Sequence, residues 1–197
     1  MAIGNIVANP SNFKDISGWK GSDNANFKFQ LYPNFNEDTQ VSTYTAKSYL
    51  RLAADHWTFN SGISNNRSFI GEDGLSVGDK YVFRIKATLA GNEPSEIYLT
   101  APQNIIPYVR SRFSSTSYSP GSIDYFKLGE ARVVDNFIEY PMECIKAVPY
   151  DELNSILNPF GLFIYSVEPY WMEECQFFKA RYGEAAYDTE EQFIIGR

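Results

Sequence analysis

The chain has 197 residues, a formal net charge of −7 and an aromatic content of 16%. Disordered chains are poor in apolar and aromatic residues, so a hydrophobic content of 44% predicts a folded protein with one sizeable core. The acidic balance argues against a general nucleic-acid binder, which needs a basic face, and against docking on an anionic membrane.

The stretch NIVANPSNFKDISGWKGS (residues 5–22) joins a short apolar run, Ile6-Val7-Ala8, to a polar loop and Gly18-Trp19. It predicts a first strand and a return loop, with Phe13 and Trp19 packed at one end of the fold rather than on a ligand. The first ten residues lack a basic start and a long apolar run, so we expect no signal peptide. We also expect no membrane insertion, because no run of about 18 apolar residues is present.

Period-two alternation continues along the chain and is clearest in YVFRIKATL (81–89), where every second side chain is apolar. This pattern predicts a half-buried antiparallel strand. Weaker alternation predicts strands at 26–32, 48–54, 95–102 (with Ile97 and Leu99 on one face) and 137–148. In the last of these, Pro141 indicates an edge position or a bulge. GLFIYSV (161–167) is apolar on both faces and predicts a central strand.

One helical signal is present, in YDELNSILNP (150–159). It predicts about two turns, with Asp151 as the cap and Asn158-Pro159 as the stop. Many short strands separated by Gly, Asn, Ser and Pro clusters predict an all-β antiparallel sandwich of jelly-roll type, in a single domain over residues 1–197. The longest expected loop, at about 101–126, carries Tyr108 and Arg110, residue types that favour interfaces.

Catalytic motifs are scarce, so we expect no enzyme; a small hydrolase is the least supported class. The one histidine, His56, cannot form a multi-histidine metal site, and adjacent acidic pairs such as Glu173-Glu174 cannot face each other as glycosidase carboxylates do. We expect no cofactor, although oxygen ligands for a structural Ca²⁺ are available. Cys144 and Cys175 are expected to be buried, unpaired thiols, with one bridge as the alternative.

Aromatic and arginine side chains give the sequence its binding candidates. Planar aromatics flanked by polar groups form platforms for sugar rings, and this chemistry selects Trp57, Tyr98 and Tyr108, with Arg84 and Arg110 as polar neighbours. Core or cross-strand packing is the competing interpretation of each aromatic.

Three segments resemble the carbohydrate-binding-module-like jelly rolls that recur in bacteriophage tail, baseplate and fibre proteins and in polysaccharide-degrading enzymes. NIVANPSNFKDISGW resembles the family's first strand, and DGLSVGDKYVFRIKATL its "L-x-x-G-x-x-Y-x-x-S" strand, with Leu75, Gly78 and Tyr81 in register. CQFFKARYGEAAY resembles the closing strand, although Arg181 stands where the family often has Glu and no Thr-Trp follows.

The resemblance implies a non-enzymatic virion protein of a tailed phage, made in the host cytoplasm. Such a domain is expected to dock on other virion proteins, to form a homo-oligomer or join a larger assembly, and to contact surface glycans. The alternative is a carbohydrate-binding module of a secreted polysaccharide-degrading enzyme, which would be extracellular. Fold alone does not decide between them.

Overall fold

The computed structural model describes residues 6–7, 11, 19–21, 31–32, 35–36, 41–42, 49–52, 62–65, 73–89, 97–111, 125–157, 160–166 and 170–180. Within these ranges the strands pair antiparallel and the helical content is a 3-10 turn, Pro102–Asn104, and one short helix, α1 (Tyr150–Leu153). The chain is therefore an all-β sandwich with one short helix, as its alternating pattern predicts.

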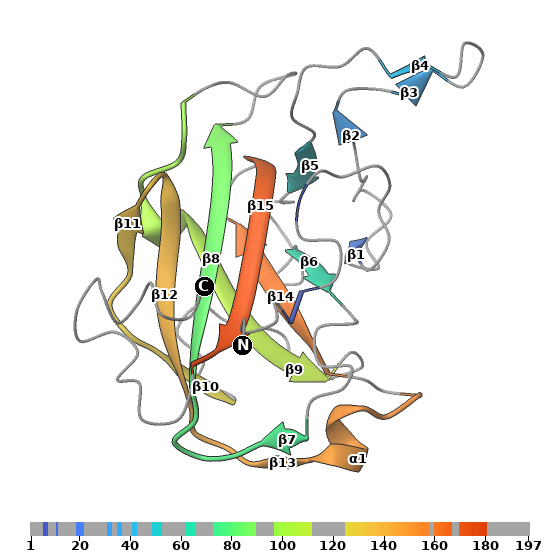
Figure 1. The fold of residues 1–197 in the computed structure, drawn as a ribbon, viewed down its shortest axis with the longest axis vertical. Coiled ribbons are helices and arrows are strands. Elements are labelled where there is room, and N and C mark those ends of the chain that lie inside the picture. The colour runs from blue at the N-terminus through green and yellow to red at the C-terminus, as the bar shows by residue number, and fades with distance from the viewer. Residues whose placement is uncertain are drawn as a thin grey trace.

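The larger sheet is built around three long neighbours, β12 (Phe137–Cys144), β8 (Lys80–Leu89) and β15 (Tyr170–Lys179), which run side by side in Figure 1. Beyond β15 lie β5 (Tyr49–Leu52) and β2 (Leu31–Tyr32). On its other side, β12 pairs with β10 (Phe126–Leu128) and β11 (Arg132–Val134).

The smaller sheet has the order β1 (Trp19–Gly21), β6 (Gly62–Asn65), β14 (Phe160–Ser166) and β9 (Ile105–Ser111). In Figure 1, β9 and β14 lie behind β8 and β15 and cross them at an angle. Two further pairs are β3 (Phe35–Asn36) with β4 (Val41–Ser42), and β7 (Gly74–Leu75) with β13 (Val148–Pro149).

The core contains side chains from both sheets. Alternate residues of the larger sheet, such as Phe83, Ile85 and Phe177, join Leu162 and Ile164 of the smaller one, and all five are at most 1% exposed. This inward face of β8 confirms the predicted strand. The burial of Trp19, at 5% exposed within the same core, supports packing rather than ligand contact.

The other face of β8 differs from the expected half-buried strand. Val82, Arg84 and Thr88 are at most 3% exposed although they point away from the core. Their register neighbours on β15 include Trp171 opposite Thr88 and Phe178 opposite Val82, so large side chains of the adjacent strand stand beside them. Alternation identified the two faces correctly, but it could not show that both are buried.

The expected loop at 101–126 is wrong for residues 105–111, which form β9 and pair with β14 over its full length. The strand escaped the sequence analysis because Pro107 lies in its middle. Among the described strands β9 pairs only with β14, and proline is tolerated where no second neighbour needs its N–H. Residues 112–124 lie outside the described residues.

Two local expectations also fail. Ile97 is 65% exposed whereas Leu99 is 4% exposed, and the segment 97–100 makes one isolated bridge, Tyr98 to Thr88, instead of a strand. The helix α1 is a single turn with Pro149 at its N-cap, so Asp151 lies in the first turn and is not the cap. Pairing of Pro149 with Gly74 in the β13–β7 ladder places the helix start directly after that bridge.

The N-terminal segment contacts β15 without forming the predicted strand at residues 6–7. Ile6 and Val7 lie in a bend, but the Ile6 N–H donates to the Phe177 carbonyl at 2.7 Å and Ser11 bridges Glu174. Phe13 lies outside the described residues, as do most of 26–32 and the chain beyond residue 180. Of the segment CQFFKARYGEAAY (175–187), residues 175–179 belong to β15.

Of the other predicted strands, 48–54 is seen as β5 over residues 49–52, and 137–148 ends at Cys144, with Val148 in the separate strand β13. Residues 160–166 form β14, which has β6 on one side and β9 on the other, the predicted central position. In β12, Ile138, Tyr140, Met142 and Cys144 face the core. Pro141 lies opposite the interruption between β10 and β11, where its carbonyl accepts from the Gly129 N–H at 2.8 Å. The predicted edge position is wrong, because β12 has β8 on one side and β10 and β11 on the other, but the break in pairing at Pro141 is a local irregularity of the kind that proline favours.

Both cysteines are buried, reduced thiols, which confirms the expectation. Cys144 lies at the end of β12 level with Asp79, whose carbonyl accepts its N–H, whereas Cys175 lies opposite Ile85. Asp79 and Ile85 are six residues apart along one extended segment, which corresponds to about 20 Å. The two cysteines are therefore much farther apart than the Cα separation that a disulfide spans.

Candidate functional site

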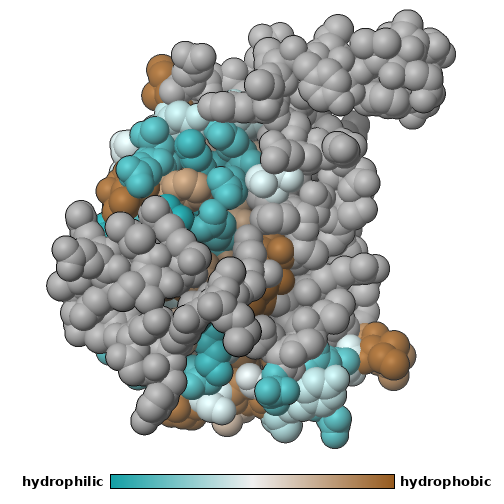
Figure 2. Space-filling view, viewed as in Figure 1, coloured by the Kyte–Doolittle hydropathy of each residue, from teal (hydrophilic) through white to brown (hydrophobic). Residues whose placement is uncertain are grey.

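The outward face of the larger sheet carries a concentration of charged and aromatic side chains, which we call the outer cluster. It consists of side chains from β8, β11, β12 and β15 and from the segment at Tyr98: Arg84, Lys86, Tyr98, Arg132, Phe137, Glu139, Glu173, Glu174 and Gln176. Figure 2 shows hydrophilic side chains gathered on this face, over the upper parts of β8, β12 and β15.

Strand register brings the centre of this cluster together. Arg84 lies opposite Glu139 on one side and Gln176 on the other. The Arg84 Nε donates to Glu139 Oε1 at 2.6 Å, and one of its terminal nitrogens donates to Gln176 Oε1 at 2.9 Å. From the neighbouring strand, the Arg132 Nε donates to Glu139 Oε2 at 3.3 Å. The carboxylate of Glu139 is therefore bound by two guanidinium groups.

Glu139 is 0% exposed, so its charge is held away from water. Burial raises the pKa of Glu139 above its ordinary value, and the charges and hydrogen bonds of Arg84 and Arg132 oppose that rise. The site therefore holds a carboxylate whose ionisation depends on its two arginine neighbours.

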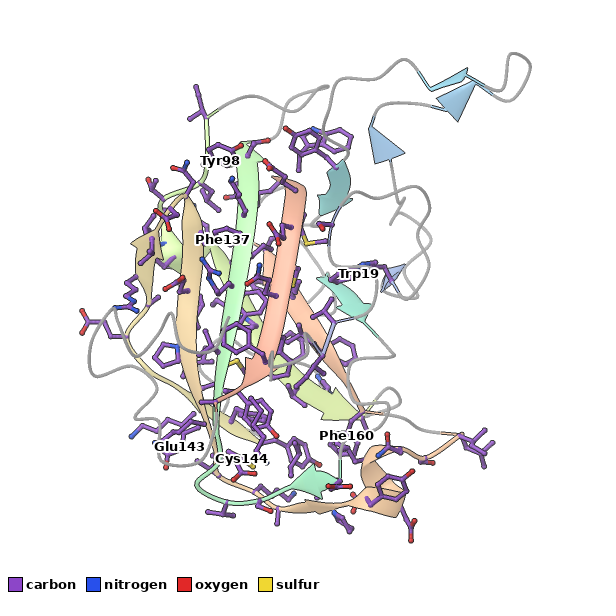
Figure 3. The ribbon with its side chains drawn as sticks, viewed as in Figure 1. Trp19, Tyr98, Phe137, Glu143, Cys144 and Phe160 are labelled. Atoms are coloured by element: carbon purple, nitrogen blue, oxygen red, sulfur yellow. The ribbon has the colours of Figure 1, made fainter. Side chains whose placement is uncertain are left out.

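The upper part of the outer cluster is aromatic. Phe137 and Tyr98 lie over the upper half of β8 in Figure 3. The Arg84 guanidinium carbon is 4.1 Å from the centre of the Phe137 ring, and the Lys86 Nζ is 4.8 Å from the centre of the Tyr98 ring. The Tyr98 hydroxyl donates to Glu173 Oε2 at 2.8 Å, and Lys86 lies 3.7 Å from the other oxygen of Glu173. Each ring thus has a cation of this chain over one face.

The charges of the outer cluster balance. Arg84, Lys86 and Arg132 supply three positive charges, and Glu139, Glu173 and Glu174 supply three negative ones. Gln176 links the two carboxylate regions by donating from Nε2 to Glu174 Oε1 at 2.8 Å. The six charged side chains of the outer cluster therefore neutralise one another.

A second aromatic group lies on the outward face of the smaller sheet. Tyr108 of β9 stands opposite Phe163 of β14, and their rings stack with centres 5.2 Å apart and planes 19° apart. The Arg110 guanidinium carbon lies 6.0 Å from the centre of the Tyr108 ring. Tyr108 is partly buried and Arg110 is 6% exposed.

The structure divides the predicted binding residues between the two sheets. Arg84 and Tyr98 belong to the outer cluster, Tyr108 and Arg110 lie on the smaller sheet, and Trp57 lies outside the described residues. The prediction missed the other members of the outer cluster, among them Glu139, Phe137 and Gln176, which contact Arg84. The signal for Glu139 was its place in FIEYPMEC, on the face opposite Ile138 and Tyr140, where an acidic residue in an apolar strand needs a partner.

Metal sites and membrane spans were also sought in the described ranges. There, no group of three or more His, Cys, Asp or Glu side chains is placed to hold a metal ion. His56 lies outside these ranges, and the structural Ca²⁺ stays a prediction. Within the same ranges, no helix has the length and apolar character needed to cross a bilayer.

The fold and the outer cluster define a β-sandwich with a neutral, hydrogen-bonded polar layer on one sheet. Comparison with protein-family models, with curated proteins and with solved structures finds no match to this chain.

Proposed function

We propose that this protein is a non-enzymatic structural component of a tailed-phage virion, in which one sandwich of jelly-roll type docks on other virion proteins. The three segments that resemble virion jelly rolls support this class, and the all-β sandwich is compatible with it. The protein would be made in the host cytoplasm and assembled into the particle, at a tail, baseplate, fibre or capsid position.

The observation that favours protein docking over sugar binding is that the candidate aromatic rings already contact other side chains of this chain. Lys86 lies over Tyr98, and Tyr108 is stacked on Phe163 with Arg110 on the same sheet. A sugar platform needs an accessible ring face. One face of the Tyr98 ring and one face of the Tyr108 ring are already in contact with a neighbouring side chain, which leaves less ring surface for a sugar, and Arg84, the predicted polar partner, is 3% exposed.

The alternative, a carbohydrate-binding module of a secreted enzyme, makes a different prediction on a glycan array. A module would be retained by defined sugars, and Tyr98→Ala or Tyr108→Ala would remove that retention. The virion proposal predicts weak or no retention for the parent protein and no difference between these variants and Tyr150→Ala, a control at an exposed tyrosine. Strong retention that depends on Tyr98 or Tyr108 would favour the module.

A further inference from the structure

Exposed apolar side chains gather at the end of the molecule formed by β7, β13 and α1. This end, which we call the β7–α1 end, comprises residues 73–78 and 147–157 and lies at the bottom of Figure 1. Ile156 is 98% exposed and Leu157 84% exposed, and hydrophobic side chains project at the lower right of Figure 2. Tyr150 and Val77, at 52% and 67% exposed, lie on the same end.

A single exposed apolar residue needs no explanation, but a group of them on one end does. Ile156 and Leu157 follow α1 after Asn154 and Ser155, and α1 packs on both β7 and β13. Leu153, the buried residue of the helix, anchors this packing at 1% exposed. The two apolar side chains are therefore carried by an anchored segment, and burying them against a partner would remove apolar surface from water.

The charged side chains within this end are acidic, and the exposed Lys146 directly precedes it in the chain. Residues 73–78 and 147–157 contain three acidic side chains and no lysine, arginine or histidine: Asp73, Asp151 and Glu152. All three are exposed. A symmetric dimer through this end would place like charges opposite each other, so a second copy of this chain is disfavoured as the occupant.

We infer that the β7–α1 end is a docking surface for a different protein, one that offers an apolar pocket rimmed by lysine or arginine side chains. Ile156 and Leu157 would enter the pocket, and Asp151 and Glu152 would face its basic rim, an arrangement that gives electrostatic complementarity. The inference rests on the proposed virion function and adds to it the surface and the chemistry of the partner.

The test uses a probe with the chemistry of the partner: a short amphipathic peptide of leucine and lysine, compared with a matched peptide of leucine and glutamate. Binding is measured by fluorescence anisotropy and located by amide chemical shifts in the full chain. We expect the lysine peptide to bind with shifts at residues 147–157, the glutamate peptide not to bind, and Ile156→Ser/Leu157→Ser to weaken binding at least about tenfold. The matched control is Ile97→Ser, at a 65% exposed apolar residue beside Tyr98, which lies far from this end in Figure 3.

Three results would overturn the inference. These are no binding of the lysine peptide, binding that the double variant leaves unchanged, and shifts confined to other surfaces. Sedimentation of the protein without peptide tests whether a second copy of this chain covers the β7–α1 end. Self-association that Ile156→Ser/Leu157→Ser abolishes would identify a second copy, and not a different protein, as the partner. None of these outcomes bears on whether the chain is present in virions, so failure of the docking surface is distinguishable from failure of the proposed function.

Discussion

The Arg84 Nε lies 2.6 Å from Glu139 Oε1, and the two side chains are 3% and 0% exposed on the face of the sheet that points away from the core. This pair joins β8 to β12. Glu139 also accepts a hydrogen bond from Arg132 of β11, and Arg84 also donates one to Gln176 of β15, so the network includes four strands. A buried ion pair is weak evidence of net stabilisation, but breaking it leaves a buried charge without its partner. The pair therefore makes the outer cluster sensitive to single substitutions.

Removing the arginine should be costly. Arg84→Met takes one of the two described guanidinium partners from the buried Glu139 carboxylate, and we expect the free energy of unfolding at neutral pH to fall by about 3 kcal/mol. Arg84→Met/Glu139→Leu should recover most of that loss, because the fully buried carboxylate is removed and Arg132, the cation that stays, is partly exposed. Denaturant unfolding of the parent, the single variant and the double variant measures this coupling. A control is the exposed ion pair of Lys80 and Glu143, whose removal should change stability little. Equal losses in the two single variants Arg84→Met and Lys80→Met would contradict the account.

The stability of the protein should depend on the protonation of Glu139. Burial raises the pKa of this group in the folded state. At pH values between the ordinary carboxyl pKa and this raised pKa, folding is therefore accompanied by the uptake of a proton. The contribution of Glu139 is thus fully present below the ordinary pKa and is lost as pH rises through the folded pKa. Glu139→Gln should flatten the unfolding free energy over that window, measured by denaturant titration at a series of pH values.

Glu143 provides the opposite sign for comparison. Its hydrogen bond with Lys80 lowers its pKa, so its contribution is present above the ordinary carboxyl pKa and is lost as pH falls through the folded one. Glu143→Gln should therefore remove a loss of unfolding free energy that the parent protein shows as pH falls, which is the opposite pH dependence to that of Glu139. The effect should be small, because the Lys80–Glu143 pair is exposed to solvent. Identical pH profiles for Glu139→Gln and the parent would show that Glu139 does not titrate in this way.

The close approach of Gly129 to Pro141 gives a packing test. A Cβ added at Gly129 would overlap the Pro141 ring, where the Gly129 N–H donates to the Pro141 carbonyl. We expect Gly129→Ala to lower the free energy of unfolding by about 1–3 kcal/mol. In a Pro141→Ala background the same change should cost much less, because the ring is gone. A cost unaffected by Pro141→Ala, measured by thermal or denaturant unfolding, would mean that the loss has another origin.

The two thiols should be inert until the protein unfolds. Burial raises the pKa of Cys175 well above its ordinary value, and burial also raises the pKa of Cys144, whose Sγ donates to the Lys146 carbonyl at 3.3 Å. Because the thiolate is the reactive form, a thiol-specific reagent at neutral pH should label neither residue in the native protein and both after denaturation without reductant. Rapid native labelling of either cysteine would contradict the burial, and no labelling after denaturation would indicate a disulfide.

Local pattern predicted the class of fold well. The alternation in 81–89 and 137–148 identified β8, the core face of β12 and their inward side chains, because a strand repeats every two residues. It failed at Ile105–Ser111, where Pro107 masked an edge strand, and at the β11–β12 hairpin. The turn of this hairpin is Asp135-Asn136, and both residues have positive φ, at 51° and 66°. That geometry is typical of a two-residue hairpin turn, and two polar residues between Val134 and Phe137 were its only local signal.

The candidate site was less accessible from sequence. Arg84 and Tyr98 were selected for their chemistry, but their partners are 55 and 75 residues away along the chain, Glu139 and Glu173 respectively. Contacts of that kind depend on strand order and register, which single-sequence alternation does not provide. For the same reason the sequence could not show that Tyr98 and Tyr108 have ring faces in contact with neighbouring side chains.

The most direct test of the central claim is the protein composition of purified particles. Particles released by a culture that expresses this gene, banded by density, would be analysed by quantitative mass spectrometry and by immunogold labelling with an antibody against this chain. The account predicts the chain in the particle at a constant ratio to a major tail or capsid protein, with label at one structural position. Its absence from particles, together with its accumulation in the culture medium or beside a polysaccharide-degrading enzyme, would contradict the account.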